Sequence, residues 1–156
     1  KLSKEAVKNI ECLTASFQDY NEKNGGRKMK ADTGEGETLT VESVAHVLGW
    51  KTVVMPQPEA EVRGGYAGDL LSFVMVHAPR GAAWMTIMNH VNVIAVAVYA
   101  GVSCVVVCEG EPVGEEMVLA AREHGVNLFC TEDTVFRVSE RLARLAEADA
   151  DGKNQR

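Results

Sequence analysis

The chain of 156 residues contains no apolar stretch of the roughly 18–20 residues that a membrane-spanning helix requires. Its longest candidate, residues 91–107, is interrupted by Asn92, Gly101 and Ser103. Residues 1–11 also lack the apolar run of a secretion signal. Apolar residues make up 46% of the chain and charged residues 24%, which is the balance of an ordinary globular protein. The sequence therefore predicts a cytoplasmic domain with its own core and no membrane partner.

Positive charge is also scarce. The chain has 16 basic and 22 acidic residues, for a net charge of −6. No Lys or Arg occurs between Gly81 and Ala121. Residues 1–37 carry seven side chains of each sign, so the whole net negative charge falls on residues 38–156. Proteins that bind nucleic acid usually present a basic surface to the phosphates, so we expect no nucleic-acid partner.

Cysteine is present but not in a metal-binding pattern. Cys104, Cys108 and Cys130 lie in apolar, β-branched segments, and Cys12 lies near the start of the chain. Buried free thiols behave as small apolar side chains. A Cys-x3-Cys spacing without a second pair is not a zinc signature, and nothing points to an oxidising compartment. We therefore predict reduced core cysteines, with no metal site and no cofactor.

The known phosphate-binding loops are absent as well. The glycine-rich segment 64–68 lacks the Gly-Lys-Ser/Thr ending of a P-loop and the G-x-G-x-x-G spacing of dinucleotide-binding loops. Without a P-loop, a kinase activity is not expected. Two interpretations of this segment stay open: a tight strand-to-helix turn with positive φ, or a loop that lets a ligand approach the backbone closely.

The first 37 residues form a separate unit in the sequence. Apolar side chains recur every three or four positions and predict an amphipathic helix over residues 2–20: Leu2, Ala6, Ile10, Leu13, Phe17 and Tyr20. Gly25 and Gly26 follow, and then a polar linker to residue 37. An isolated helix of this length is marginal in water, so we expect it to dock, in cis or on a second subunit. The main domain is predicted over residues 38–146, with a polar tail over residues 147–156.

Strands and helices alternate along the main domain. The predicted strands cover residues 51–55, 83–88, 102–108 and 126–130. The predicted helices cover residues 41–48, 70–78, 91–100 and 115–124. Asp69 is expected to cap the second of these, and residues 131–133 are expected to cap a last helix. This order predicts an α/β fold with a mainly parallel sheet and flanking helices. Because residues 102–108 are apolar on both faces, they are expected to form a central strand.

Ligands of such sheets bind beyond the carboxyl ends of the strands. In this chain, those ends are followed by Asn89 and His90, by Glu109 and Glu111, and by Glu132 and Asp133. Carboxylates there also stabilise helix N-termini without any ligand. An anion held by backbone amides and a bound cation are the two other interpretations. The residues that we predict to bind a ligand come from the glycine-rich segment and the 89–90 junction: Gly64, Gly65, Tyr66, Gly68, Asp69, Asn89 and His90.

Residues 61–72, Glu-Val-Arg-Gly-Gly-Tyr-Ala-Gly-Asp-Leu-Leu-Ser, resemble the signature of DRTGG domains. Residues 84–87, residues 89–97 and the strand, acidic loop and helix over residues 105–123 are also similar to that family. The resemblance covers residues 39–145. Of the Asp-Arg-Thr-Gly-Gly motif itself, only the two glycines are present, as Gly64 and Gly65.

The resemblance implies an α/β module of bacterial proteins. Such modules lie beside the kinase domain of HPr kinase/phosphorylase, in some phosphotransacetylases, and between CBS modules of regulated pyrophosphatases. It implies a non-enzymatic regulatory or ligand-sensing function, a homodimer, and a small metabolite or nucleotide as ligand. Two alternatives stay open: a small transferase or hydrolase that uses His90 with Asp69 or Glu109, and a pure protein–protein interaction domain.

The charge pattern generates a first testable prediction. At physiological salt the protein should not bind a random DNA duplex with submicromolar affinity, because its surface offers few cations to replace the counterions of the phosphates. A fluorescence-anisotropy titration at two salt concentrations measures this. Tight binding that weakens steeply with salt would contradict it.

Overall fold

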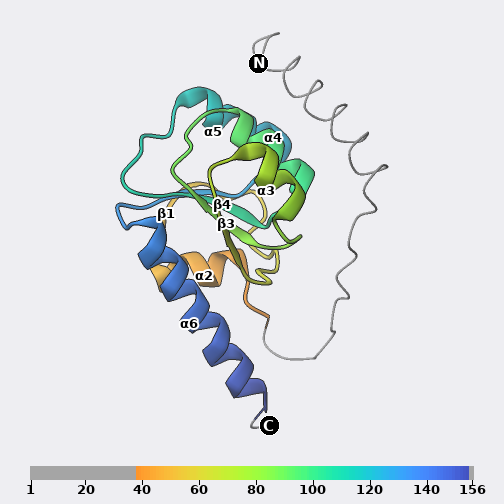
Figure 1. The fold of residues 1–156 in the computed structure, drawn as a ribbon, viewed down its shortest axis with the longest axis vertical. Coiled ribbons are helices and arrows are strands. Elements are labelled where there is room, and N and C mark those ends of the chain that lie inside the picture. Colours follow the sequence, from red (N-terminus) through yellow and green to blue (C-terminus); the bar gives the residue numbers. More distant parts are fainter. Residues whose placement is uncertain (1–37, 155–156) are drawn as a thin grey trace.

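The structure of this protein is a computed structural model that describes residues 38–154. The helix predicted over residues 2–20 and the linker after it lie outside the described residues. A five-stranded sheet with the order β1-β5-β4-β3-β2 lies at the centre (Figure 1). All neighbouring strands are parallel except β1, which pairs antiparallel with β5. The strands are β1 (Lys51–Val54), β2 (Gly65–Ala67), β3 (Ala83–Thr86), β4 (Cys104–Val107) and β5 (Leu128–Cys130).

Helices cover both faces of the sheet, which makes three layers (Figure 1). On one face lie α3 (Leu71–His77), α4 (Asn92–Ala100) and α5 (Glu115–His124). On the other lie α2 (Val41–Leu48) and α6 (Val135–Asn154). The predicted α/β class with a mainly parallel sheet is therefore confirmed. Among the described residues, no helix combines the length and the apolar composition needed to cross a bilayer.

Strand β4 lies at the centre of the sheet, as its sequence predicted. Every residue of β4 is buried, and Val105 has 0% exposure. Val105 and Val107 pack against the α3–α4–α5 layer, whereas Cys104 and Val106 pack against α2 and α6. β-branched side chains on both faces suit a parallel strand that is covered on both sides.

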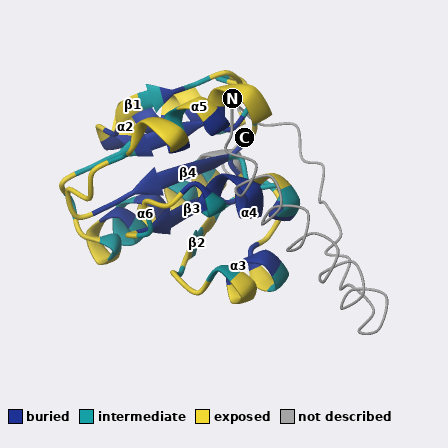
Figure 2. Cartoon of the chain, turned by 90° about the horizontal axis from the view of Figure 1, so that it is seen from above, coloured by how far each residue is buried: buried dark blue, intermediate teal, exposed yellow. Residues whose placement is uncertain are grey.

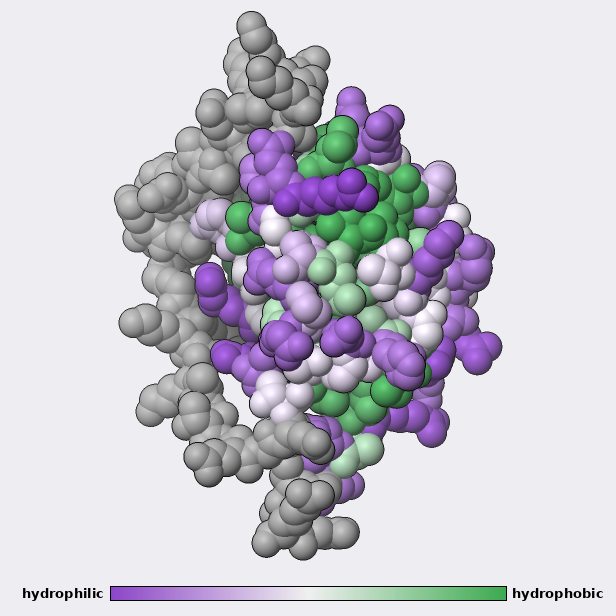
Figure 3. All heavy atoms as spheres, turned by 180° about the vertical axis from the view of Figure 1, so that it is seen from behind, coloured by the Kyte–Doolittle hydropathy of each residue, from purple (hydrophilic) through white to green (hydrophobic). Residues whose placement is uncertain are grey.

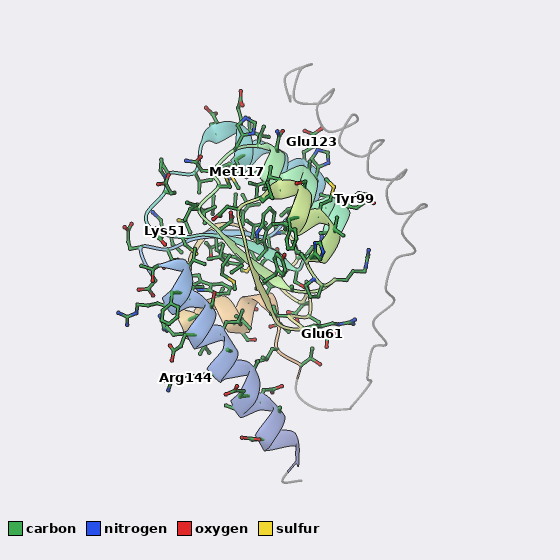
Figure 4. The ribbon with its side chains drawn as sticks, in the orientation of Figure 1. Lys51, Glu61, Tyr99, Met117, Glu123 and Arg144 are labelled. Atoms are coloured by element: carbon green, nitrogen blue, oxygen red, sulfur yellow. The ribbon has the colours of Figure 1, made fainter. Side chains whose placement is uncertain are left out.

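The side chains of β3 also alternate between the two faces of the sheet, so this strand contributes to the core on both sides. Trp84 faces the α3–α4–α5 layer and Met85 faces the α2–α6 layer. The indole of Trp84 donates a hydrogen bond from Nε1 to the carbonyl oxygen of Gly68, at 2.9 Å. Because a buried indole needs a partner for its N–H group, this bond fixes the connection after β2 against β3. Met117 of α5 fills the space above the sheet (Figure 4).

The glycine-rich segment differs from the prediction. Residues 64–68 were expected to form a loop, but Gly65–Ala67 form the edge strand β2, parallel to β3. Gly65 pairs with Ala83 and Tyr66 with Trp84. The strand is three residues long and contains one large side chain, so it carries no alternating apolar pattern that the sequence could reveal. Pairing with β3 and packing of Tyr66 decide its conformation.

Two predicted helix boundaries are also wrong. Asp69 does not cap the helix after it: α3 starts after Leu70 and has no side-chain cap. Residues 131–133 do not cap the last helix either. The Oγ1 atom of Thr134 accepts from the backbone N–H of Arg137, at 3.3 Å. The predicted polar tail continues α6 as far as Asn154. The alanines of this segment favour a helix. The segment has no apolar side chains at helical spacing, so the sequence pattern did not predict that the helix continues.

Two of the cysteines lie in the core, as their apolar segments predicted. Cys104, Cys108 and Cys130 are free thiols, and the first two are buried. Burial raises the pKa of Cys104 from 9.0 to about 12, because the thiolate would lose its hydration. Burial raises the pKa of Cys108 to about 11, and the carboxylates of Glu109, Asp69 and Asp133 act in the same direction. Both thiols are therefore protonated and unreactive in the folded state.

These thiols predict how stability changes at alkaline pH. Above pH 9 the unfolded chain releases thiol protons that the folded chain retains, so the free energy of unfolding should fall as pH rises toward 11–12. Below that range this contribution is constant. Urea unfolding at a series of pH values measures the slope. The double variant Cys104→Ala/Cys108→Ala should show a shallower fall than Cys130→Ala, and equal slopes would contradict the prediction.

Candidate functional site

The parallel strands β2 to β5 end at one edge of the sheet, which we call the carboxyl edge. The helices that follow β2, β3 and β4 lie on one face, whereas α6, which follows β5, lies on the other. A crevice is expected where adjacent connections leave toward opposite faces. In this fold, that place lies between the ends of β4 and β5.

The protein's own hydrogen bonds bridge this place. The backbone N–H of Glu109 donates to the carbonyl of Asp133, and that of Gly110 to the carbonyl of Thr131, both at 3.0 Å. Glu109 has a left-handed backbone, with φ of 63°, and its Oε1 atom accepts from the N–H of Val135 at 3.3 Å. The carboxylate of Glu109 therefore contacts the N-terminus of α6, where a negative charge is stabilising.

Asp69 joins two other connections at the carboxyl edge. Its Oδ1 atom accepts from the hydroxyl of Thr86 at 2.7 Å and from the backbone N–H of Ile87 at 2.9 Å. Thr86 is fully buried, and its Oγ1 atom also accepts from the N–H of Met88. The hydrogen bonds from Thr86 and Ile87 both end on the same oxygen of Asp69. Its Oδ2 atom accepts no hydrogen bond from the residues that the structure describes.

Asn89 and His90 lie in the next connection, between β3 and α4. The side-chain amide of Asn89 donates to the carbonyl of Pro112 at 3.1 Å and to Glu111 at 3.4 Å. The Nδ1 atom of His90 accepts from the backbone N–H of Asn92 at 3.2 Å. In the neutral ring the proton is therefore on Nε2, which leaves one donor available at an exposed side chain.

Asn92 is a site residue that the sequence analysis did not select. It is the first residue of α4, and its Oδ1 atom is buried without a donor among the described residues. Leaving a buried acceptor unpaired costs roughly 1–3 kcal/mol. The available signal was that Asn92 is the only strongly polar residue in the apolar segment 91–100. In the sequence, Asn92 is one of three residues that interrupt the apolar segment 91–107.

The structure divides the predicted ligand-binding residues into two groups. Asp69, Asn89 and His90 lie at the carboxyl edge. Asp69 follows Gly68 after the end of β2, and Asn89 and His90 follow the end of β3. Gly64, Gly65 and Tyr66 lie at the other end of β2 or within it, and Tyr66 packs against the α3–α4–α5 layer. The positive φ that we expected in this segment occurs at Gly64, with 142°.

The groups that approach the backbone of Gly65 closely are side chains of the protein, Leu142 and Met85, and not a ligand. A Cβ atom on Gly65 would lie 2.8 Å from Cδ2 of Leu142 and 3.1 Å from Cε of Met85. Gly65 thus lets α6 pack onto the edge of the sheet. A Cβ atom on Gly68 would meet only ordinary contacts, at 3.5 Å from Tyr66 and 3.6 Å from Val74.

The remaining histidines and the arginines of α6 lie elsewhere. His77 is exposed and stacks on Phe73, with ring centroids 3.8 Å apart, rather than packing in the core. On α6, Arg141 pairs with Asp133 at 3.1 Å, and Arg144 pairs with Glu140 and points away from the sheet (Figure 4). Within residues 38–154, no group of three His, Cys, Asp or Glu side chains is arranged to hold a metal ion.

A hollow of about 320 Å³ lies at the opposite end of the sheet. It is formed where α4 and α5 end and where β4 and β5 begin. Gln57 crosses its rim, because its Nε2 atom donates to the carbonyl of Gly125 at 2.6 Å. The residues that line it are Gln57, Ala60, Ala97, Val98, Gly101, Val102, Ser103, His124, Gly125 and Val126. None of the predicted ligand-binding residues lines this hollow.

No family model and no curated protein sequence matches the chain. Among solved structures, the fold is similar to the CBS and DRTGG domains of the regulatory region of Clostridium perfringens pyrophosphatase, crystallised with its activator diadenosine tetraphosphate. The TM-score is 0.55 and the sequence identity is 13%. The match covers 66% of this chain and 45% of that one, so the chain spans less than half of the length of its structural neighbour. The likeness supports the expected CBS/DRTGG-like fold, and at this identity it concerns the fold alone.

The two glycines generate a prediction about stability. Gly65→Val should destabilise the protein by roughly 1–3 kcal/mol, because the added atoms press on Leu142 and Met85. Gly68→Ala, the matched control, should change stability by less than about 1 kcal/mol, since its surroundings leave room for a methyl group. Urea unfolding measures both. The packing explanation fails if Gly65→Val is as stable as Gly68→Ala, or if Leu142→Ala gives no partial rescue of Gly65→Val.

Proposed function

We propose that this protein is a regulatory module that binds a small ligand at the carboxyl edge, around Asp69, His90 and Asn92. The observation that carries the proposal is the buried Oδ1 atom of Asn92, which has no donor among the described residues. Such an atom is stabilised when a bound molecule or an ordered water donates to it. It lies in the connection that also presents the Nε2–H group of His90, which donates to none of the described residues.

The charges nearby indicate the chemistry of the ligand. Asp69 and Glu111 lie at this edge, and residues 81–121 contribute no Lys or Arg. The available groups are two acceptors, Oδ2 of Asp69 and Oδ1 of Asn92, and one donor, Nε2–H of His90. This set suits a neutral or amine-bearing molecule, such as a small metabolite or the base and ribose of a nucleoside. A triphosphate would meet mainly negative charge.

The hydrogen bonds of the edge offer a route from ligand to fold. Asp69 joins the β2–α3 connection to the end of β3, and Asn89 joins the β3–α4 connection to Pro112, before α5. A ligand that competes for these groups would shift three connections together. The structural neighbour is a regulatory region crystallised with a nucleotide activator, which supports a regulatory function for the present chain. We further propose that the module acts as a homodimer.

The enzymatic alternative, a transferase or hydrolase using His90 with Asp69 or Glu109, has less support. Within residues 38–154, neither carboxylate accepts a hydrogen bond from His90. Glu109 contacts the N-terminus of α6 instead. The interaction-domain alternative is favoured by a different observation, the exposed apolar side chains of α3 and its surroundings.

Asn92→Leu tests the proposed site. Leu has the same branched arrangement of four side-chain heavy atoms as Asn and removes the unpaired acceptor, so the melting temperature without ligand should stay the same or rise. Calorimetry and thermal-shift assays with adenosine, its phosphates and small amines should show a ligand for the parent protein. That ligand should bind at least about tenfold more weakly to Asn92→Leu and to His90→Ala.

His124→Ala is the matched control, because His124 is exposed and lines the hollow at the opposite end of the sheet. It should bind the ligand as the parent protein does. Equal affinity of Asn92→Leu and the parent protein would place the ligand elsewhere. A ligand that is lost in His124→Ala and retained in Asn92→Leu would assign binding to that hollow. If none of these compounds binds the parent protein, the interaction-domain alternative is favoured.

A further inference from the structure

Three large apolar side chains are exposed around the start of α3, and we call them the α3 patch. They are Leu70, Phe73 and Ile87, with exposures of 67%, 52% and 42%. Leu70 and Phe73 are one helical turn apart, and the backbone N–H of Ile87 bonds to Asp69, the neighbour of Leu70. Figure 2 shows α3 at the margin of the molecule, with an exposed side that faces away from α4.

The inner side of α3 is already used. Val74, Met75 and Ala78 are buried and pack into the core with α4. On the outer side, the imidazole of His77 stacks on the ring of Phe73. This stacked pair extends the α3 patch by one more helical turn. The patch therefore runs along the whole outer side of a seven-residue helix, and contiguous exposed apolar surfaces of this kind commonly mark contact sites.

The chain contains a segment whose chemistry matches the patch. Residues 2–20 carry the stripe that predicts an amphipathic helix, and Leu13, Phe17 and Tyr20 form its last turns. A helix with such a stripe has to cover it to be stable in water. Phe17 and Tyr20 could meet the ring of Phe73, since pairs of aromatic rings add to the stability that comes from buried area alone.

The place where the chain enters the fold puts the patch within reach. The carbonyl of Leu39 accepts from the N–H of Val62 at 2.7 Å, and Thr40 bridges to Glu61. Residues 61–62 lead directly into β2, and α3 follows β2. Residues 21–37 number 17 and can span up to about 60 Å when extended, far more than the length of β2 and α3.

We propose that residues 2–20 dock as a helix on the α3 patch of the same chain, with Leu13 and Phe17 against Leu70 and Phe73. This proposal does not depend on the ligand site. The other exposed large apolar side chains lie on four other helices. They are Val47 of α2, Val98 of α4, Leu119 of α5 and Phe136 of α6. On the face drawn in Figure 3, apolar side chains form a second patch at the height of α4 and α5, bordered by hydrophilic side chains.

Hydrogen exchange of the full chain, followed by mass spectrometry, tests the docking. The variant Leu13→Glu/Phe17→Glu places two charges on the stripe. Its amides in α3 should exchange about tenfold faster than those of the parent protein, because losing the buried side chains removes local protection. Exchange in α2 and α6 should not change. The matched control, Ala15→Glu/Gln18→Glu, adds the same charge on the opposite side of the predicted helix and should leave α3 unchanged.

A second variant probes the receiving surface. Phe73→Ser alters an exposed position, so the domain should fold, and circular dichroism checks this. It should speed exchange in residues 2–20, and combining it with Leu13→Glu/Phe17→Glu should add nothing further in α3. Unchanged exchange in α3, or a change confined to α4 and α5, would overturn the proposal. So would a lower mass by light scattering for Leu13→Glu/Phe17→Glu than for its control, since docking would then join two chains.

Discussion

The burial of β4 on both faces is the constraint on which the other elements depend. Val105 and Val107 need a cover on one side and Cys104 and Val106 on the other, so neither helical layer suffices alone. Each of these side chains gains roughly 1.5–3 kcal/mol when it is removed from water. The α3–α4–α5 layer follows directly from the strand–helix alternation. The second layer has to be supplied by α2 and α6, from the two ends of the described chain, and this explains why both helices are part of the domain.

This arrangement also determines the character of the carboxyl edge. Since α6 leaves toward the opposite face from α5, the ends of β4 and β5 would diverge, and Glu109, Gly110 and Asp133 join them by hydrogen bonds. At the ends of β2 and β3, all connections lead to helices on one face. Within residues 38–154, three polar atoms there have no partner: one oxygen of Asp69, Nε2 of His90 and the buried oxygen of Asn92. Regulation by a small ligand is therefore proposed for this half of the edge.

The proposed ligand site and the α3 patch adjoin each other through Asp69. Its carboxylate holds Ile87, which belongs to the patch, and its neighbour Leu70 starts the exposed side of α3. A ligand that draws on Asp69 or His90 would therefore act on the base of α3, and a helix docked there would sense the change. The module would then need no second domain to convert binding into a change of exposed surface.

The sequence alone determined those parts of the fold that carry strong periodicity. Two-sided apolarity placed β4 at the centre, and the helix over residues 115–124 has the bounds that Gly114 before it and Gly125 after it predicted. The three-residue strand β2, the role of Asp69 and the length of α6 were decided only by tertiary structure. A glycine-rich strand has no pattern of its own and forms because β3 offers a partner and Leu142 fills the space above Gly65. Asn92 likewise looked like an interruption of an apolar helix, because an unpaired atom can be recognised only when every neighbouring donor is in place.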